Sequence, residues 1–194
     1  MNHHDFWQGK YPESIARTID TNIYPTILDL FKEACRKYAN KPAFSNMGRT
    51  LTFAEVDKYS ATFAAWIQQN TDLQVGDRIA VQMPNLLQYP IVVFGAMRAG
   101  LVIVNTNPLY TAREMEHQFK DAGCKALVTL ANFGQLVQEV LPKTGIRYVI
   151  ISELADMLPF PKRVVVNNIV KYVKKLVPAY HLPMAIPFTQ VMKA

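Results

Sequence analysis

Hydrophobic and polar positions follow two different patterns along this chain, one before residue 78 and one after it. Residues 1–25 show no regular period and predict an irregular leader. Thr26 then precedes apolar residues at helical spacing, Leu28, Phe31, Cys35 and Tyr38, which predicts an amphipathic helix with Asp29 near its start. Residues 42–52 contain two short extended runs around Asn46-Met47-Gly48 and predict a hairpin.

A second helix is predicted directly after the hairpin. Thr52 and Glu55 have the spacing of a capping box, in which the threonine hydroxyl accepts from the backbone amide three residues on and the glutamate reaches back. The apolar side of this helix consists of Val56, Tyr59, Phe63, Trp66 and Ile67.

Short apolar runs alternate with helical patterns from residue 78 to residue 151. The runs 78–83, 101–104, 125–130 and 147–151 predict strands. Helices are predicted between them, from about 86 to 99, from the capping box Thr111–Glu114 to Gly123, and over 132–141. Because strands that alternate with helices build βαβ units, we expect an α/β fold with a largely parallel sheet flanked by helices. The run 101–104 is entirely apolar, so both of its faces are expected to be covered.

Residues 164–177 differ in kind from the preceding segments, and Pro159-Phe160-Pro161 separates them. On a helix, the polar residues Asn167, Asn168, Lys171, Lys174 and Lys175 fall on one side and the valines, Ile169 and Leu176 on the other. The lysines either contact an anionic membrane surface or form the solvated side of a packed helix, and a strand over 164–166 is a further alternative. Residues 179–194 predict a loop or linker. We therefore expect an α/β unit over 1–160 and a basic amphipathic helix with a linker over 161–194.

Composition and charge narrow the classes of protein. Half of the residues are hydrophobic and 19% are charged, which indicates a folded chain. The start of the sequence lacks a signal peptide, and the most apolar stretch, 89–104, is too short and too interrupted for a membrane span, so a cytoplasmic protein is expected. Cys35 and Cys124 form no CxxC motif and are expected to be buried, reduced thiols. The net charge is +6, but the basic residues are not interleaved with aromatics as in a nucleic-acid-binding face.

No motif in the sequence completes a catalytic, cofactor or metal site. Gly95 and Gly100 have the spacing of a phosphate loop but lack the Lys-Ser/Thr that must follow it, so helix packing and a helix end explain them better. The four histidines have no metal-ligand spacing, and His117 is expected to pair with Glu114 at the surface. Asp77 and Asp121 flank turn glycines, where short polar side chains serve the turn. We therefore assign no catalytic, cofactor-binding or metal-binding residue.

An ordered series of short segments resembles the beginning of the adenylate-forming acyl-CoA ligases. The segments are Leu51-Thr52-Phe53-Ala54-Glu55, Gly76 to Asn85, Gln88-Tyr89-Pro90, Gly95 to Gly100, Val104 to Thr111 with Arg113-Glu114, and Asp121-Ala122-Gly123. The Asn107-Pro108-Leu109-Tyr110-Thr111 run is similar to the bacterial long-chain fatty acid branch, as is 164–183. Single segments such as Gly-Asp-Arg are weak signals, whereas their order over nearly the whole chain is specific.

The resemblance implies a subdomain of the large N-terminal domain and a two-step reaction in the parent enzyme. A fatty acid carboxylate attacks the α-phosphorus of ATP, and CoA then displaces AMP from the acyl-adenylate. The parent is expected to need ATP, Mg²⁺ and CoA, because the first step brings two anions together. In the family the phosphate loop and the catalytic lysine lie later in the chain. We therefore expect them beyond Ala194, expect no cofactor on this chain, and expect the chain alone to be inactive.

Two hypotheses follow for the chain itself. It is either the N-terminal part of a fatty acid–CoA ligase or a non-catalytic module that binds a membrane or a partner. Given the resemblance to this family, we consider membrane contact through Lys171, Lys174 and Lys175 as well supported as plain packing. Such contact implies a peripheral position on the inner face of the cytoplasmic membrane. Pro84-Asn85, at the end of the first parallel strand, either faces the substrate channel or only ends the strand. A sheet that has lost neighbours also favours a homodimer.

Overall fold

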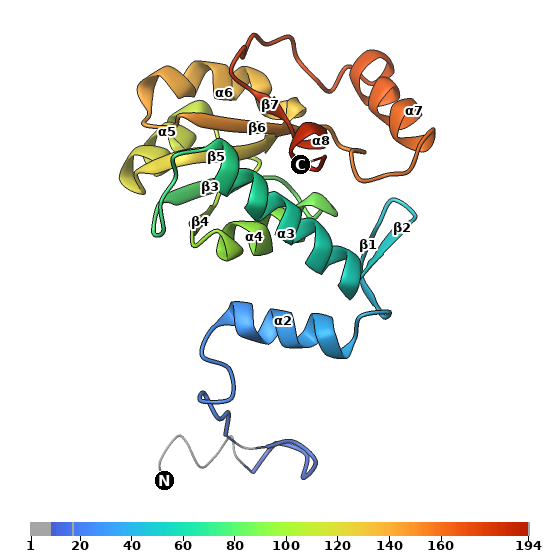
Figure 1. Cartoon of the computed structure of the whole chain (residues 1–194). Helices are drawn as coiled ribbons and strands as arrows, with labels where there is room; N and C mark the ends of the chain where they lie inside the picture. The colour runs from blue at the N-terminus through green and yellow to red at the C-terminus, as the bar shows by residue number, and fades with distance from the viewer. Residues whose placement is uncertain (1–8, 17, 194) are drawn as a thin grey trace.

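The computed structural model describes residues 9–16 and 18–193, and it shows a parallel sheet with helices on both faces (Figure 1). The sheet has five strands in the order β4-β3-β5-β6-β7, and every neighbouring pair is parallel. The predicted α/β class with a largely parallel sheet is therefore confirmed. The strands are Arg78–Gln82 (β3), Val102–Asn105 (β4), Cys124–Leu130 (β5), Tyr148–Ser152 (β6) and Ile186–Pro187 (β7).

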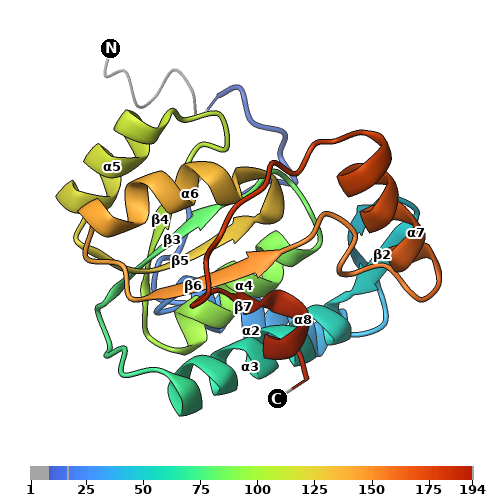
Figure 2. The ribbon, with the colours of Figure 1, turned by 90° about the horizontal axis from the view of Figure 1, so that it is seen from above.

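The helices form unequal layers on the two faces of the sheet (Figure 2). Helices α3, α4 and α8 lie against one face, and α2 packs outside α3 and α4, whereas α5 and α6 cover the other face. The helices are Ile27–Lys37 (α2), Phe53–Asn70 (α3), Gln88–Arg98 (α4), Ala112–Asp121 (α5), Gly134–Val140 (α6), Lys162–Asn168 (α7) and Phe188–Val191 (α8). Short turns extend two of them: Ala131–Phe133 (η1) and Leu141–Lys143 (η2) flank α6, and the π-helical Ile169–Val173 (η3) follows α7.

The local sequence signals act as expected at the helix starts. The Thr26 hydroxyl accepts from the Asp29 amide at the start of α2. Both capping boxes are complete, at Thr52 with Glu55 and at Thr111 with Glu114. The hairpin is also confirmed, with strands β1 (Pro42–Asn46) and β2 (Arg49–Thr52) in antiparallel register. These signals succeed because they depend on contacts between residues close in the chain.

Helices α3 and α4 approach each other closely at Gly95. A Cβ atom at Gly95 would lie 2.7 Å from Phe63 Cδ1 and 2.9 Å from the Ser60 carbonyl oxygen. Nearby, Arg98 donates to the Ser60 hydroxyl and forms an ion pair with Asp57, which joins the same two helices. Gly95 is therefore a packing glycine, as its sequence context predicts.

Strand β4 differs from the sequence expectation because it is an edge strand. Its apolar sequence predicts coverage on both faces, but Val102 is 49% exposed and no residue of the strand is fully buried. The register explains the difference, since β4 pairs with β3 and with no other strand in the described part of the chain. The buried apolar residue is instead Leu101, which precedes the strand.

The segment after residue 160 also corrects the sequence interpretation. The helical segment begins at Lys162 and ends at Val173, so Leu176 and Val177 lie outside it, and the alternative strand over 164–166 is wrong. Residues 179–194 are not only a loop or linker, because β7 joins the sheet beside β6 and α8 buries Phe188 and Val191. The short length of β7, two residues, gives no periodic pattern from which a strand could be predicted.

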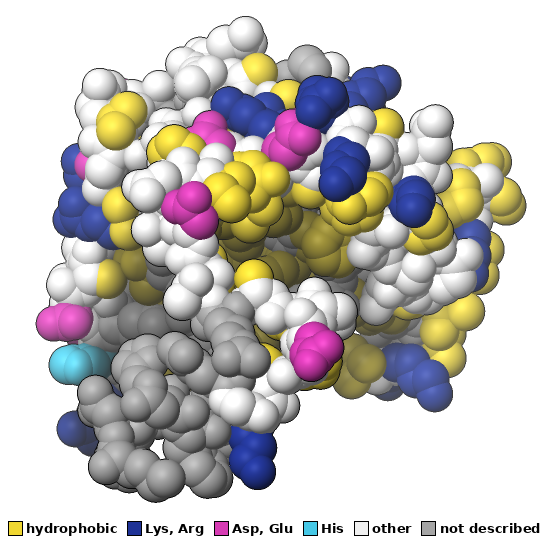
Figure 3. All heavy atoms as spheres, turned by 90° about the horizontal axis from the view of Figure 1, so that it is seen from below, with side chains coloured by type: hydrophobic (Ala, Val, Ile, Leu, Met, Phe, Trp, Pro, Cys, Tyr) yellow, Lys and Arg dark blue, Asp and Glu magenta, His cyan; other side chains and the backbone are white. Residues whose placement is uncertain are grey.

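Hydrophobic side chains remain exposed on the side of the molecule where α2 lies. Figure 3 shows this side, with hydrophobic side chains lining a hollow. Ile27 and Leu28 of α2 line such a cavity of about 340 Å³ together with Met97 and Leu101, and Ile27 is 66% exposed. An apolar surface of this kind is typical of a domain that packs against further protein or membrane.

Candidate binding site at the carboxyl end of the sheet

Buried polar side chains gather where the parallel strands end. Gln82 ends β3 and Ser152 ends β6, while Thr129 is the penultimate residue of β5. Thr106 follows β4 directly, and Gln88 begins α4 just after β3. All five are at most 4% exposed. Since ligands of open parallel sheets bind outside the carboxyl ends of the strands, this edge is the candidate site of the fold.

The first polar group lies where the strand order reverses, between β3 and β5. The Thr129 hydroxyl donates to Gln82 Oε1 over 3.0 Å, and Gln82 Nε2 lies 3.4 Å from the Met115 sulfur. Gln82 and Thr129 are register partners on neighbouring strands, so the backbone pairing positions their side chains together. The group satisfies its own polar atoms and stiffens the sheet at the position where the crevice of such a fold opens.

The second polar group joins the start of α4 to the loop after β6. Gln88 Nε2 donates to Ser152 Oγ at 3.1 Å and to the carbonyl oxygen of Glu153 at 3.0 Å. Ser152 Oγ in turn donates to Asp156 Oδ2 over 3.0 Å. One buried amide therefore fixes the position of the loop that follows the strand.

Asp156 and Asn167 extend this group to α7. Asn167 Nδ2 donates to Glu153 Oε2 at 2.8 Å and to Asp156 Oδ1 at 3.4 Å, while its Oδ1 accepts from the Ala155 amide. Burial raises the pKa of Asp156, and hydrogen bonds from Glu153 and Ser152 oppose that shift. A raised pKa means that the carboxylate form destabilises the fold at neutral pH, and this cost falls as the pH decreases through the folded-state pKa.

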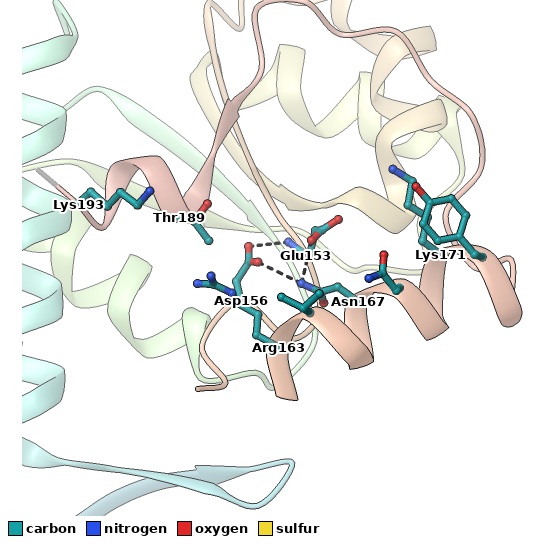
Figure 4. Close-up of a pocket in the computed structure, with 10 residues that line it drawn as sticks. Glu153, Asp156, Arg163, Asn167, Lys171, Thr189 and Lys193 are labelled. Atoms are coloured by element: carbon teal, nitrogen blue, oxygen red, sulfur yellow. Dashed lines mark hydrogen bonds between the residues drawn. The ribbon is translucent and has the colours of Figure 1, made fainter. Parts of the chain in front are cut away.

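A cavity of about 300 Å³ lies between this loop, α7 and α8 (Figure 4). Figure 4 shows Arg163, Asn167 and Lys171 reaching toward the loop from one side, with Thr189 and Lys193 on the other. Arg163, Lys171 and Lys193 form no ion pair with a carboxylate in the part of the chain that the structure describes. The cavity can bind a small polar ligand through these charges, but its lining contains no His or Cys that could act as a base or nucleophile.

Pro84 and Asn85 lie at the same edge of the sheet. Asn85 lines a second cavity, of about 250 Å³, between the β1–β2 hairpin and the start of α4. Its carbonyl oxygen accepts from Asn46 Nδ2 at 3.2 Å, and its other neighbours include Phe44, Leu87 and Tyr89. Asn85 therefore both ends the strand and borders a mainly apolar hollow, so the choice between the two interpretations stays a prediction.

The three lysines singled out from the sequence are not presented together on one helix. Lys171 lies in η3, lines the polar cavity and places its ammonium group 5.4 Å from the centre of the Tyr172 ring. Lys174 caps the end of η3, and Lys175 adopts a left-handed conformation beyond it. All three are exposed. Their contact with a membrane stays a prediction.

Other residues considered from the sequence take structural roles. Cys35 and Cys124 are buried free thiols, and burial raises the pKa of each to about 11. The expected pair of His117 and Glu114 does not form, because the Glu114 carboxylate accepts from Thr111. Within residues 9–16 and 18–193, no three His, Cys, Asp or Glu side chains gather closely enough to ligate a metal ion. No helix in those residues has both the length and the hydropathy for crossing a bilayer.

The sequence interpretation missed the buried polar residues at the strand ends. Their signal is present, since Gln82, Thr129 and Ser152 each interrupt or end an otherwise apolar run. A single polar residue at the end of a strand is equally typical of a turn, so the pattern could not show that these side chains meet. The hydrogen bonds of Gln88 and Asn167 join residues up to 66 positions apart and depend on the topology.

Comparison with known proteins gives the same family along most of the chain. A family model described as "AMP-binding enzyme" matches residues 31–189. The chain is 48% identical over 186 residues to a long-chain-fatty-acid–CoA ligase of Haemophilus influenzae, and 46% identical over 187 residues to one of Yersinia pestis. Each alignment covers 96% of this chain and 33% of the relative, so the chain spans about a third of the length of the curated relatives it matches.

Solved structures agree on the fold. Acetoacetyl-CoA synthetase from Streptomyces lividans matches 86% of this chain and 25% of its own, with a TM-score of 0.67 and 16% identity. A long-chain-fatty-acid-CoA ligase from Archaeoglobus fulgidus matches 64% of this chain and 26% of its own, with a TM-score of 0.59 and 24% identity. At these identities the matches show the shared fold alone.

Proposed function

The chain belongs to the family of AMP-binding enzymes, and we propose that it forms the N-terminal part of an ATP-dependent long-chain fatty acid–CoA ligase. The observation that carries the proposal is the identity of 45–48% to bacterial long-chain-fatty-acid–CoA ligases over 96% of the chain. In this proposal the complete protein joins a fatty acid to CoA through an acyl-adenylate, with release of AMP and pyrophosphate. Its substrates are a fatty acid, ATP and CoA, with Mg²⁺ as the metal.

The residues of this chain support binding and framework rather than chemistry. The carboxyl end of the sheet offers buried amides and hydroxyls. It also offers three cations, Arg163, Lys171 and Lys193, which can bind a negatively charged ligand. They do not fit Mg²⁺ and ATP by themselves, because the described residues have no cluster of metal ligands and the sequence has no phosphate loop. We therefore derive no reaction step from these side chains and propose that the isolated chain is inactive.

The test is pyrophosphate exchange into ATP, which reports the adenylation step. We expect the complete gene product that contains this sequence to exchange labelled pyrophosphate only when a long-chain fatty acid is present, and the 194-residue chain to show none. Pyrophosphate exchange by the 194-residue chain alone would contradict the proposal that the isolated chain is inactive. If the complete product shows no exchange and forms no adenylate with any fatty acid, the ligase proposal itself is wrong.

A second candidate function rests on the basic segment after residue 160. We propose that Lys171, Lys174 and Lys175 bring the protein to the anionic inner face of the cytoplasmic membrane, where fatty acids partition. All three lysines are exposed, as this contact requires. The alternative is a non-catalytic module that uses only this membrane contact or forms a homodimer. Saturable vesicle binding without turnover by the complete product would favour the module.

A further inference from the structure

The segment formed by α7 and η3 is attached to the domain by its polar side. Asn167 binds the loop after β6, Lys162 donates to the Met47 carbonyl oxygen at 2.7 Å, and Asn132 donates to the Leu176 carbonyl oxygen at 2.8 Å. No residue of α7 or η3 is buried. Val166 and Val170 are half-buried, so one edge of the apolar stripe meets the domain while the rest faces outward, whereas a surface helix ordinarily turns the whole stripe to the core.

The outward side of the segment is apolar and strongly exposed. Val165 is 53% exposed, Ile169 42% and Val173 70%, and Leu176, just beyond η3, is 57% exposed. Val165, Ile169 and Val173 recur at the spacing of one helical face. A contiguous exposed apolar surface of this kind marks a contact with a membrane or with another protein.

The electric charge of the chain identifies the kind of partner. Residues 157–194 contain six Lys or Arg and no Asp or Glu, whereas residues 1–156 contain fifteen of each sign. The entire net charge of +6 therefore belongs to the segment that carries the exposed apolar side. An apolar face bordered by lysines is the pattern of helices that lie in the head-group region of anionic bilayers.

We infer that the apolar side of α7 and η3, formed by Val165, Ile169 and Val173, and Leu176 just beyond η3 insert into the head-group region of an anionic bilayer. This inference rests on the membrane contact proposed above and assigns the main binding energy to the apolar residues, with Lys174 and Lys175 at the lipid phosphates. A second copy of the chain fits less well. A twofold interface places the same patch against itself, so the basic segments of both copies would meet and repel.

The test compares vesicles of phosphatidylcholine with and without phosphatidylglycerol by co-sedimentation of the full chain. The first variant, Val173→Ser with Leu176→Ser, removes two apolar side chains from the proposed face. Its matched control is Val75→Ser with Leu109→Ser, which changes the same residue types at positions that are 85% and 86% exposed. A third variant changes Lys171, Lys174 and Lys175 to Glu. Urea unfolding of each variant verifies that the fold is intact.

We expect the wild type and the control to bind the vesicles with phosphatidylglycerol equally. The Val173→Ser, Leu176→Ser variant should bind them with about one tenth of the wild-type affinity or a smaller fraction. If that variant binds like the wild type while the Glu variant does not bind, the contact is purely electrostatic and this inference is wrong, although the membrane contact stands. If the wild type binds neither vesicle, both are wrong. A dimer without lipid that the serine variant dissociates would assign the apolar side to a second copy.

Discussion

Replacing Gly95 with valine should remove about 3 kcal/mol or more from the free energy of unfolding of the chain. The Cβ alone would lie 2.9 Å from the Ser60 carbonyl oxygen and 2.7 Å from Phe63 Cδ1, and both atoms belong to α3. Because Phe63 is fully buried, its ring has no solvent space into which to turn. Helices α3 and α4 would have to separate, and they carry much of the core on that face of the sheet.

The control for this change is a glycine with space around it. A Cβ at Gly145 would meet only the Cys124 carbonyl oxygen, at 3.8 Å, so Gly145→Ala should change stability by no more than about 0.5 kcal/mol. Gly95→Ala should be destabilising even though alanine favours helices by about 1 kcal/mol over glycine. Urea denaturation measures all three proteins. Equal midpoints for Gly95→Ala and Gly145→Ala would contradict the close contact of α3 and α4.

Replacing Gln88 with leucine should cost about 2 to 3 kcal/mol of stability and loosen the loop after β6. The leucine keeps the volume but removes the donor shared by Ser152 Oγ and the Glu153 carbonyl oxygen. Since Ser152 is fully buried, water cannot easily replace the lost bond. The loop also holds Asp156, so α7 should lose its polar anchor as well.

Gln74→Leu is the matched control, because Gln74 is exposed and its side-chain amide contacts only the Asp72 carbonyl oxygen in the same turn. We expect it to change stability by about 0.5 kcal/mol or less. Hydrogen exchange localises the effect, with faster exchange over residues 153–168 in Gln88→Leu and unchanged exchange in the β1–β2 hairpin. Uniform acceleration over the whole chain, or none, would contradict the role of Gln88 as the link between α4 and this loop.

The parts of the fold that the sequence predicts are those determined by nearby residues. Thr52 with Glu55 and Thr111 with Glu114 begin their helices as expected, because a capping box needs only one turn of chain. Gly100 and Gly123 adopt positive φ and end α4 and α5, which also is a local property. The strand–helix alternation over 78–151 then leaves few topologies, since parallel strands need crossover connections.

The parts that the sequence does not predict depend on which elements become neighbours. β4 is as apolar as a central strand but lies at an edge, and the pattern of Leu101 to Val104 contains nothing that distinguishes the two positions. β7 and α8 form because β6 offers a free edge and the core accepts Phe188. The direction in which α7 turns its apolar side was likewise fixed by Asn167 and the loop after β6, rather than by the helical period.

The candidate site shows the same division between local and distant determinants. The position of the crevice at the carboxyl ends of the strands follows from the parallel topology alone. The polar groups that occupy it, Gln82 with Thr129 and Gln88 with Ser152, join residues 47 and 64 positions apart. Their types are visible in the sequence, but their meeting requires the register of β3, β5 and β6.

The measurement that tests the central claim most directly is the identity of the acyl-CoA made by the complete gene product. The product is supplied with ATP, Mg²⁺, CoA and equal amounts of a long-chain fatty acid and benzoate, and mass spectrometry identifies the thioesters. Our account predicts long-chain acyl-CoA, with AMP formed in equal amount, and no benzoyl-CoA. Benzoyl-CoA as the main product, or thioester formed without AMP, would contradict it.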